Sequence, residues 1–332
     1  MLAVLTVIAA LAQAPQGQIA FLQESDAPAR RVCVLDLGTG KVQAIGTGSW
    51  DDAPAWSPDG LRLAFGSAAE SGPGMEIRVA DADGANLRVL PTRQKACSAP
   101  VWSPDGKRLA YAAGEGNARR IYVFDLDGGT ETEWGQAKQP MIQAVWKTDS
   151  ALVGVGLGEV HGAKTTDLYA VEIDEVSALV PTRGGGLYIE WNPAIQRRGG
   201  VLAYESNDGG DREIFVDLPG RGIIDVSNDR EADWNPVWSP DGKWLAFESF
   251  RSGRRGIYRV SPQRSVVYPV SVDAASDAWS PTWSPDSAWL AFVSTRTGMP
   301  SLHVCRAEGG NVQPIPGGEH GLAPAWRPVG KK

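Results

Sequence analysis

The fold is decided by the stretch Pro-Val-Trp-Ser-Pro-Asp-Gly-Lys-Trp-Leu-Ala-Phe, residues 236–247. Its central Ser-Pro-Asp-Gly predicts a tight turn, because Pro presets φ, Asp bonds back to the local chain and Gly tolerates positive φ. Close copies stand at residues 54–65, 100–111 and 281–292, weaker ones at 144–155 and 189–204, and a final stub at 324–328. The chain is therefore built from one repeated unit.

The tryptophan of this stretch recurs at a nearly constant interval. The motif tryptophans are Trp56, Trp102, Trp146, Trp191, Trp238, Trp283 and Trp326, and their successive separations are 46, 44, 45, 47, 45 and 43 residues. A period of this size is typical of the four-stranded blades of a β-propeller. In each unit we expect four short strands, A to D, which are antiparallel because their connections are short.

The two ends of the chain complement each other. The first unit lacks a strand A and begins with a strand B near Gln18 to Leu22, whereas the chain ends with a lone strand A around Trp326. We expect this last strand to complete the first blade, which removes open sheet edges. Strand B occurs seven times, so the sequence predicts an all-β, seven-bladed propeller of four-stranded antiparallel blades, formed as one domain by residues 15–332.

The first 14 residues read as a secretory signal peptide. Residues 2–12 are apolar, and Ala10-Leu11-Ala12 or Ala12-Gln13-Ala14 provides a small-x-small cleavage site. The run is too short to span a bilayer, and no Lys or Arg precedes it. A buried first strand is the alternative interpretation. The signal peptide predicts a periplasmic or secreted protein.

Composition excludes several function classes. The net charge of −7 gives no basic footprint for nucleic acid. The three cysteines, Cys33, Cys97 and Cys305, have no metal-ligand spacing and are expected to be small buried hydrophobes. The sequence has no Gly-x-Ser-x-Gly elbow, His-Glu-x-x-His or phosphate-binding loop. We expect no cofactor, no metal and no enzymatic activity.

Pro-x-Trp-Ser-Pro-Asp-Gly-x-x-Leu-Ala-Phe, followed by Ser-x-Arg-x-Gly and Ile-Tyr, resembles the TolB-type propeller repeat of bacteria. The likeness is strongest at residues 236–260 and 281–304. It implies a TolB-like propeller, although TolB itself looks like a six-bladed propeller behind an N-terminal α/β domain that has no counterpart here. The same repeat occurs in prolyl-oligopeptidase-type enzymes, which carry a hydrolase domain that this sequence lacks.

Candidate binding residues lie on one predicted face, which carries the D–A and B–C loops. Four tryptophans outside the motif fall in the D–A loops: Trp50, Trp134, Trp234 and Trp279. Exposed, they would offer flat platforms for a sugar ring, a proline-rich peptide or a protein hot spot. The alternative is that they pack between blades.

Charged residues share this face. Asp52, Asp233 and Asp277 are expected near the channel mouth, with Arg251 and Arg296 beside them. The alternative is a rim of solvated ion pairs. Together these features predict a monomeric, non-catalytic binding scaffold for a protein or peptide partner. The alternatives are a polysaccharide-acting lyase or hydrolase and a glycan-binding propeller.

Overall fold

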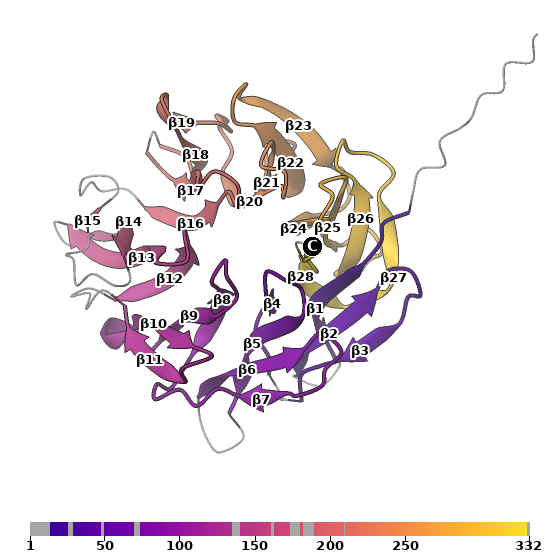
Figure 1. The fold of residues 1–332 in the computed structure, drawn as a ribbon. Helices are drawn as coiled ribbons and strands as arrows, with labels where there is room; N and C mark the ends of the chain where they lie inside the picture. The colour runs from indigo at the N-terminus through magenta and orange to yellow at the C-terminus, as the bar shows by residue number, and fades with distance from the viewer. Residues whose placement is uncertain are drawn as a thin grey trace, which may run out of the picture.

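The chain forms a ring of seven β-sheets (Figure 1). The computed structural model describes residues 14–25, 29–47, 50–69, 74–134, 140–160, 163–172, 180–181, 189–208 and 210–330. Within these residues, 28 strands make seven sheets of four antiparallel strands, and one short 3-10 turn, η1, spans Gly116–Ala118. The predicted seven-bladed propeller is confirmed.

In every blade the chain runs outward from the axis through strands A, B, C and D. The A strands are β28 (Gly321–Trp326), β4 (Ala55–Trp56), β8 (Ser98–Trp102), β12 (Met141–Trp146), β16 (Glu190–Ile195), β20 (Asp233–Trp238) and β24 (Ala278–Trp283), for blades 1 to 7. The B strands are β1 (Gln18–Glu24), β5 (Arg62–Ala68), β9 (Arg108–Ala113), β13 (Ala151–Val160), β17 (Leu202–Ser206), β21 (Leu245–Ser249) and β25 (Trp289–Ser294). The C strands are β2 (Arg30–Asp36), β6 (Met75–Asp81), β10 (Arg120–Asp125), β14 (Ala163–Glu172), β18 (Glu213–Leu218), β22 (Gly256–Ser261) and β26 (Ser301–Arg306). The D strands are β3 (Val42–Ala44), β7 (Arg88–Val89), β11 (Thr130–Glu133), β15 (Val180–Pro181), β19 (Gly222–Asp225), β23 (Val266–Ser271) and β27 (Gln313–Glu319).

The ring closes as the sequence predicts. The C-terminal strand β28 pairs antiparallel with β1, with Trp326 opposite Ile19 and Ala325 opposite Ala20. Arg327 N donates to Gln18 O at 2.8 Å just beyond this pairing. Blade 1 therefore contains both ends of the described chain, and β1 has no unpaired edge facing the axis.

The motif tryptophans bind neighbouring blades to each other. In five blades the buried indole Nε1 donates to a backbone oxygen of the preceding A strand. These bonds are Trp56 to Ala325 (3.0 Å), Trp102 to Ala55 (2.9 Å), Trp146 to Val101 (3.0 Å), Trp238 to Ala194 (3.2 Å) and Trp283 to Val237 (3.0 Å). Each indole thus satisfies its only donor while filling the seam between two blades.

The strand register corrects one motif assignment. Glu190 pairs with Ser206, as Asp233 pairs with Ser249, so Trp191 is equivalent to Trp234. The prediction that Trp191 is the motif tryptophan of blade 5 is therefore wrong. Ile195 occupies that place, because Trp238 bonds the carbonyl of the residue just before it. The sequence alone suggests the wrong alignment, because Trp191 is the single tryptophan of blade 5 and is therefore matched to the motif tryptophans of the other blades.

The hydrophobic core is divided among the seams between blades. At the seam of blades 6 and 7, for example, Val270 of β23 packs in one cluster with Trp283 and Phe292. At the closing seam, Phe21 of β1 shares a cluster with Trp326 and with Leu302 of blade 7. The rigidity of the ring therefore depends on contacts that cross from blade to blade.

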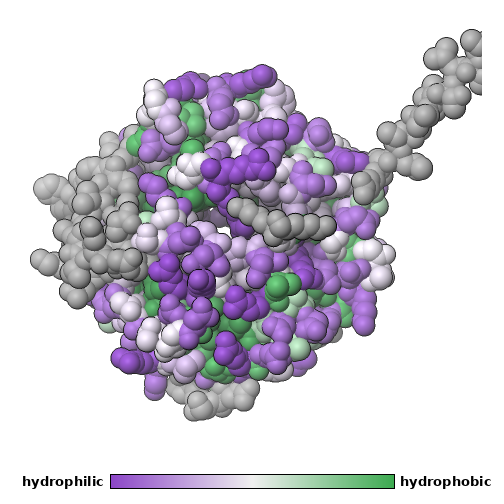
Figure 2. All heavy atoms as spheres, viewed as in Figure 1, coloured by the Kyte–Doolittle hydropathy of each residue, from purple (hydrophilic) through white to green (hydrophobic). Residues whose placement is uncertain are grey.

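The predicted signal peptide lies outside the described residues, except for Ala14. Across the described ranges, no helix is long and apolar enough to cross a bilayer. The face of the ring seen in Figure 2 is mostly hydrophilic, with smaller hydrophobic patches between the polar residues.

Candidate functional site

A cavity of about 350 Å³ lies on the axis of the ring. It is lined by Ala53, Pro54, Gln143, Asn192, Pro193, Asn235, Pro236, Val237, Ser280, Pro281, Ala323, Pro324 and Ala325. All of these residues lie in A strands or just before one, so the cavity is the central channel.

A backbone irregularity shapes this channel. The third residue of several A strands has a left-handed φ, as in Asn192 (45°), Asn235 (51°), Ser280 (53°) and Ala323 (47°). At all four of these positions the pairing with strand B shifts register. Such bulges re-aim side chains next to binding sites. Asn tolerates the left-handed region better than most residues, which suits it to these positions.

One side of the channel carries a ladder of amides. Gln143 Nε2 donates to Asn192 Oδ1 at 3.2 Å, and Asn192 Nδ2 donates to Asn235 Oδ1 at 2.9 Å. Asn235 Nδ2 in turn donates to Glu248 Oε1 at 2.9 Å. The equivalent lining positions in blades 1 and 2 are Ala323 and Ala53. The channel therefore has a polar side over blades 4 to 6 and an apolar side opposite.

Two buried carboxylates, Glu205 and Glu248, support the amide ladder from strand B. Glu205 Oε1 accepts from the Asn235 backbone N at 2.7 Å and from Asn192 Nδ2 at 2.6 Å. Glu248 Oε1 accepts from the Ser280 backbone N at 2.7 Å. Burial raises the pKa of Glu205, whereas the hydrogen bonds from Asn235 and Asn192 act in the opposite direction. Each carboxylate joins its own blade to the next one.

Each of these carboxylates also has an arginine partner. Arg212 Nη1 lies 3.5 Å from Glu205 Oε2, and Arg255 Nε donates to Glu248 Oε2 at 2.6 Å. Arg255 also lies over the Trp279 ring, 5.7 Å from its centroid. The arginine therefore neutralises a buried charge and stacks on an indole at the same time.

Trp191, Trp234 and Trp279 occupy the same strand position in three successive blades, and all three are partly exposed. Trp234 meets the Phe250 ring edge to face, with centroids 5.2 Å apart. Their A strands begin at the face that carries the D–A and B–C loops. We name these tryptophans, together with Gln143, Asn192 and Asn235, the channel mouth.

The other two candidate tryptophans lie elsewhere. Trp50 is 43% exposed and is covered by the Arg30 guanidinium, 4.0 Å from its ring centroid. Trp134 is only 2% exposed and packs in the core between blades 3 and 4. For Trp134 the alternative interpretation therefore holds, because its indole packs between blades and offers no exposed platform.

The acidic candidates are engaged in local bonds. Asp52 Oδ1 accepts from the Ala53 N at 2.8 Å, and Asp277 lies 3.5 Å from Arg254. Asp233 is fully buried, and its Oδ2 accepts from Arg251 Nη2 at 2.6 Å. Only the Asp277–Arg254 contact agrees with the alternative of a rim of solvated ion pairs, because Asp52 bonds a backbone N–H and the Asp233–Arg251 pair includes a fully buried carboxylate.

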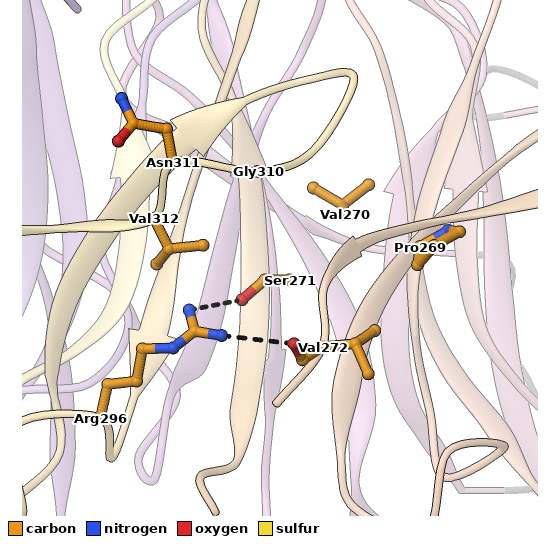
Figure 3. A pocket seen from close by; sticks show the side chains of 8 residues that line it. All are labelled: Pro269, Val270, Ser271, Val272, Arg296, Gly310, Asn311 and Val312. Atoms are coloured by element: carbon orange, nitrogen blue, oxygen red, sulfur yellow. Dashed lines mark hydrogen bonds between the residues drawn. The ribbon is translucent and has the colours of Figure 1, made fainter. Parts of the chain in front are cut away.

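Arg296 lines a different hollow. Its Nε donates to Asp273 Oδ2 at 2.9 Å, and its Nη1 donates to Ser271 Oγ at 3.2 Å. Figure 3 shows the guanidinium reaching toward Ser271 and Val272, with Val312 between it and Asn311. This hollow, about 510 Å³, lies between blades 6 and 7 and is lined by none of the residues around the axial cavity.

Sequence reasoning missed the amides and carboxylates of the channel. A signal for them existed, because Trp-Asn-Pro recurs at residues 191–193 and 234–236, and an aromatic-Glu-Ser run recurs at 204–206 and 247–249. Blades 5 and 6 therefore share a motif that the Ser-Pro-Asp-Gly turns do not mark. Its meaning depends on contacts between blades, which the sequence does not display.

Solved structures share this architecture. TolB from Acinetobacter baumannii superimposes with a TM-score of 0.58 and 19% identity over 94% of this chain and 67% of its own. The chain has the fold of a TolB-like β-propeller. No protein-family model matches the sequence, and no curated protein matches it either.

The TolB-like fold is shared with enzymes. The propeller domain of the Trilobed protease from Pyrococcus furiosus has a TM-score of 0.70 and 14% identity, with 91% of this chain and 92% of that one covered. It is described as having an open velcro topology, whereas here β28 pairs with β1. Oligogalacturonate lyase in complex with manganese has a TM-score of 0.65 and 17% identity, with 91% and 86% covered. Identities this low establish the fold alone.

Proposed function

We propose that this TolB-like propeller is a monomeric, non-catalytic, extracytoplasmic scaffold that binds a protein or peptide partner at its D–A/B–C loop face. The channel mouth carries the proposal. It combines three partly exposed indoles on successive blades with an amide ladder held at fixed positions. Rigid aromatic groups beside fixed polar groups are the usual composition of a protein hot spot.

The bonding of the mouth favours recognition over catalysis. Glu205 and Glu248 are both fully buried and accept several N–H donors, so both carboxylates are engaged in structural hydrogen bonds between blades. In the described ranges, no group of three His, Cys, Asp or Glu residues is placed to hold a metal ion. Amide and indole groups can instead bind the backbone and side chains of an extended chain.

Glycan binding is the second candidate function. It is favoured by the partly exposed indoles of Trp191, Trp234 and Trp279, because flat rings beside planar amide and guanidinium groups also suit a sugar ring. Binding of oligosaccharides with no protein captured would support this candidate over a protein partner.

The test compares two faces of the ring. We expect a Trp191→Ala, Trp234→Ala, Trp279→Ala variant to lose at least about tenfold in affinity for its partner, as hot-spot indoles do. Wild type and variant would be used to capture proteins from an envelope extract. Each protein that the variant fails to capture would then be titrated in pure form by calorimetry.

Trp244 and Trp289 supply the matched control. Both are partly buried and follow a Ser-Pro-Asp-Gly or Ser-Pro-Asp-Ser turn at the opposite face, Trp244 just before β21 and Trp289 at the start of β25. Each lies under an arginine. A Trp244→Ala, Trp289→Ala variant should keep full affinity. Equal losses in the two variants would assign the effect to stability, and no loss in either would contradict the proposed site.

A further inference from the structure

Four carboxyl groups and one guanidinium form a cluster that includes Asp233, the residue just before Trp234. Arg251 bonds Asp233 at 2.6 Å and lies 4.0 Å from Asp229. The charges of Asp233 and Asp225 both act to raise the pKa of Glu213, and the charge of Arg251 acts to lower the pKa of Asp225. If all four acids were ionised, the cluster would hold three uncompensated negative charges. Negative charges held close together in a buried site disfavour one another, so we expect at least one of these acids to keep its proton.

Glu213 ties the cluster to the neighbouring loop. It lies at the start of β18 and is 5% exposed. Its Oε2 accepts from Ser227 Oγ at 2.5 Å, and its Oε1 accepts from the Asp229 backbone N at 3.1 Å. Ser227 Oγ also accepts from Ile214 N at 2.8 Å. This one side chain therefore fastens both ends of the 227–229 turn to the blade.

Asp233 connects the cluster to the channel mouth, because Trp234 follows it directly in β20. Its Oδ2 bonds Arg251, whereas its buried Oδ1 has no hydrogen-bond partner of good geometry among the described residues. Ser227, Ser249 and Glu213 all lie around this carboxyl. An acceptor without a donor beside a second carboxyl is the arrangement in which one shared proton is most stabilising.

Ionisation behaviour agrees with this geometry. Burial, together with the charges of Asp233 and Asp225, raises the pKa of Glu213 to about 8, against the hydrogen bonds from Ser227 and Asp229. Burial also raises the pKa of Asp233, although Arg251 opposes that shift.

We propose that Glu213 and Asp233 share one proton, and that this proton, by removing one negative charge from the buried cluster, stabilises the closed position of the loop of residues 226–232 next to Trp234. The loop is then a pH-sensitive latch on the D–A side of the channel mouth. The regulatory role rests on the proposed function, since the latch controls how firmly Trp234 is presented to a partner. The proton-sharing itself is a property of the free protein.

The sign of the effect follows from linkage. When the loop opens, Glu213 returns to its ordinary pKa, so the open state releases a proton that the closed state keeps. The closed position of the loop is therefore most stable relative to the open one below about pH 4.5. The opening equilibrium grows about tenfold per pH unit up to about pH 8 and then levels off.

Hydrogen exchange on the free protein tests the latch. Protection factors of amides 226–232, corrected for the intrinsic pH dependence of exchange, should fall about 100-fold between pH 5.5 and 7.5 in wild type. In Glu213→Gln they should stay constant, so that at pH 7.5 the variant is better protected than wild type. An unchanged fall in Glu213→Gln would overturn the proposal.

Glu76→Gln is the matched control. Glu76 pairs with Ser67 as Glu213 pairs with Ser206, so it has the equivalent place in blade 2, but it is more exposed and lies beside Cys97 instead of a second carboxyl. This variant should behave as wild type.

Asp233→Asn provides a second test of the latch. Because it removes the neighbouring charge, the pH at which the protection factors stop falling should move below 8. If that pH did not move, the result would contradict a shared proton.

The two proposals fail in different ways. Equal capture by the mouth variant and the control variant of the opposite face, at every pH, would reject the proposed function and leave the exchange result intact. Absence of the exchange transition, or its survival in Glu213→Gln, would reject the latch whatever the partner. If the latch holds, partner affinity in wild type should be higher at pH 5.5 than at pH 7.5, and Glu213→Gln should remove that difference. Equal affinities in wild type would reject the regulatory role.

Discussion

A chain that ends at His320 should no longer unfold as one cooperative unit and should associate through its open blade. The truncation removes β28, whose Trp326 is buried against blades 1 and 7. It also removes the Ala325 oxygen to which Trp56 donates, and it leaves the inner edge of β1 unpaired. Loss of one large buried side chain costs about 3–5 kcal/mol, which approaches the total stability of many domains, and here a whole strand is lost.

Urea unfolding followed by circular dichroism, with sedimentation at several concentrations, measures both effects. The control is a chain that ends at Pro328. It keeps β28 and the bonds from Arg327 to Gly60 and Gln18, and it loses only residues such as the exposed Val329. The control should unfold like wild type. A His320 truncation that stayed monomeric with an unchanged midpoint would show that β28 does not close the ring.

The ring and its closure could be predicted from sequence because they follow from local signals repeated many times. A Ser-Pro-Asp-Gly turn fixes one hairpin wherever it occurs, and the missing strand A before Gln18 matches the extra one at Trp326. One ambiguous copy does not disturb such a pattern. For this reason the blade count was correct although Trp191 was assigned to the wrong strand position.

The candidate site was harder to predict because it depends on contacts between blades. Glu205 meets Asn235 across 30 residues of sequence, and neither residue belongs to a recognised motif. Trp134 and Trp234 both lie between the D strand of one blade and the motif tryptophan of the next, yet one fills a seam and the other stays partly exposed. The difference depends on which side chains of the neighbouring blade surround each indole, and a local sequence pattern does not show these contacts.

Replacement of Trp283 by alanine should lower the free energy of unfolding by about 3–5 kcal/mol. The indole lies in the seam of blades 6 and 7, in contact with a cluster that includes Phe292 and Val270. Its loss leaves a cavity that two rigid sheets cannot collapse to fill. It also leaves the Val237 oxygen without the donor that reaches it at 3.0 Å.

Two companion variants separate the contributions to this loss. Trp283→Phe keeps most of the apolar volume and removes the N–H, so it should cost less than the alanine variant, with about 1 kcal/mol of the loss due to the hydrogen bond. Trp50→Ala removes an indole that is 43% exposed and should cost under about 1 kcal/mol. Urea midpoints of the three variants would give this order. If Trp50→Ala lowered the free energy of unfolding as much as Trp283→Ala, burial in the seam could not be the source of the stability. An exposed indole and a buried one would then stabilise the ring equally.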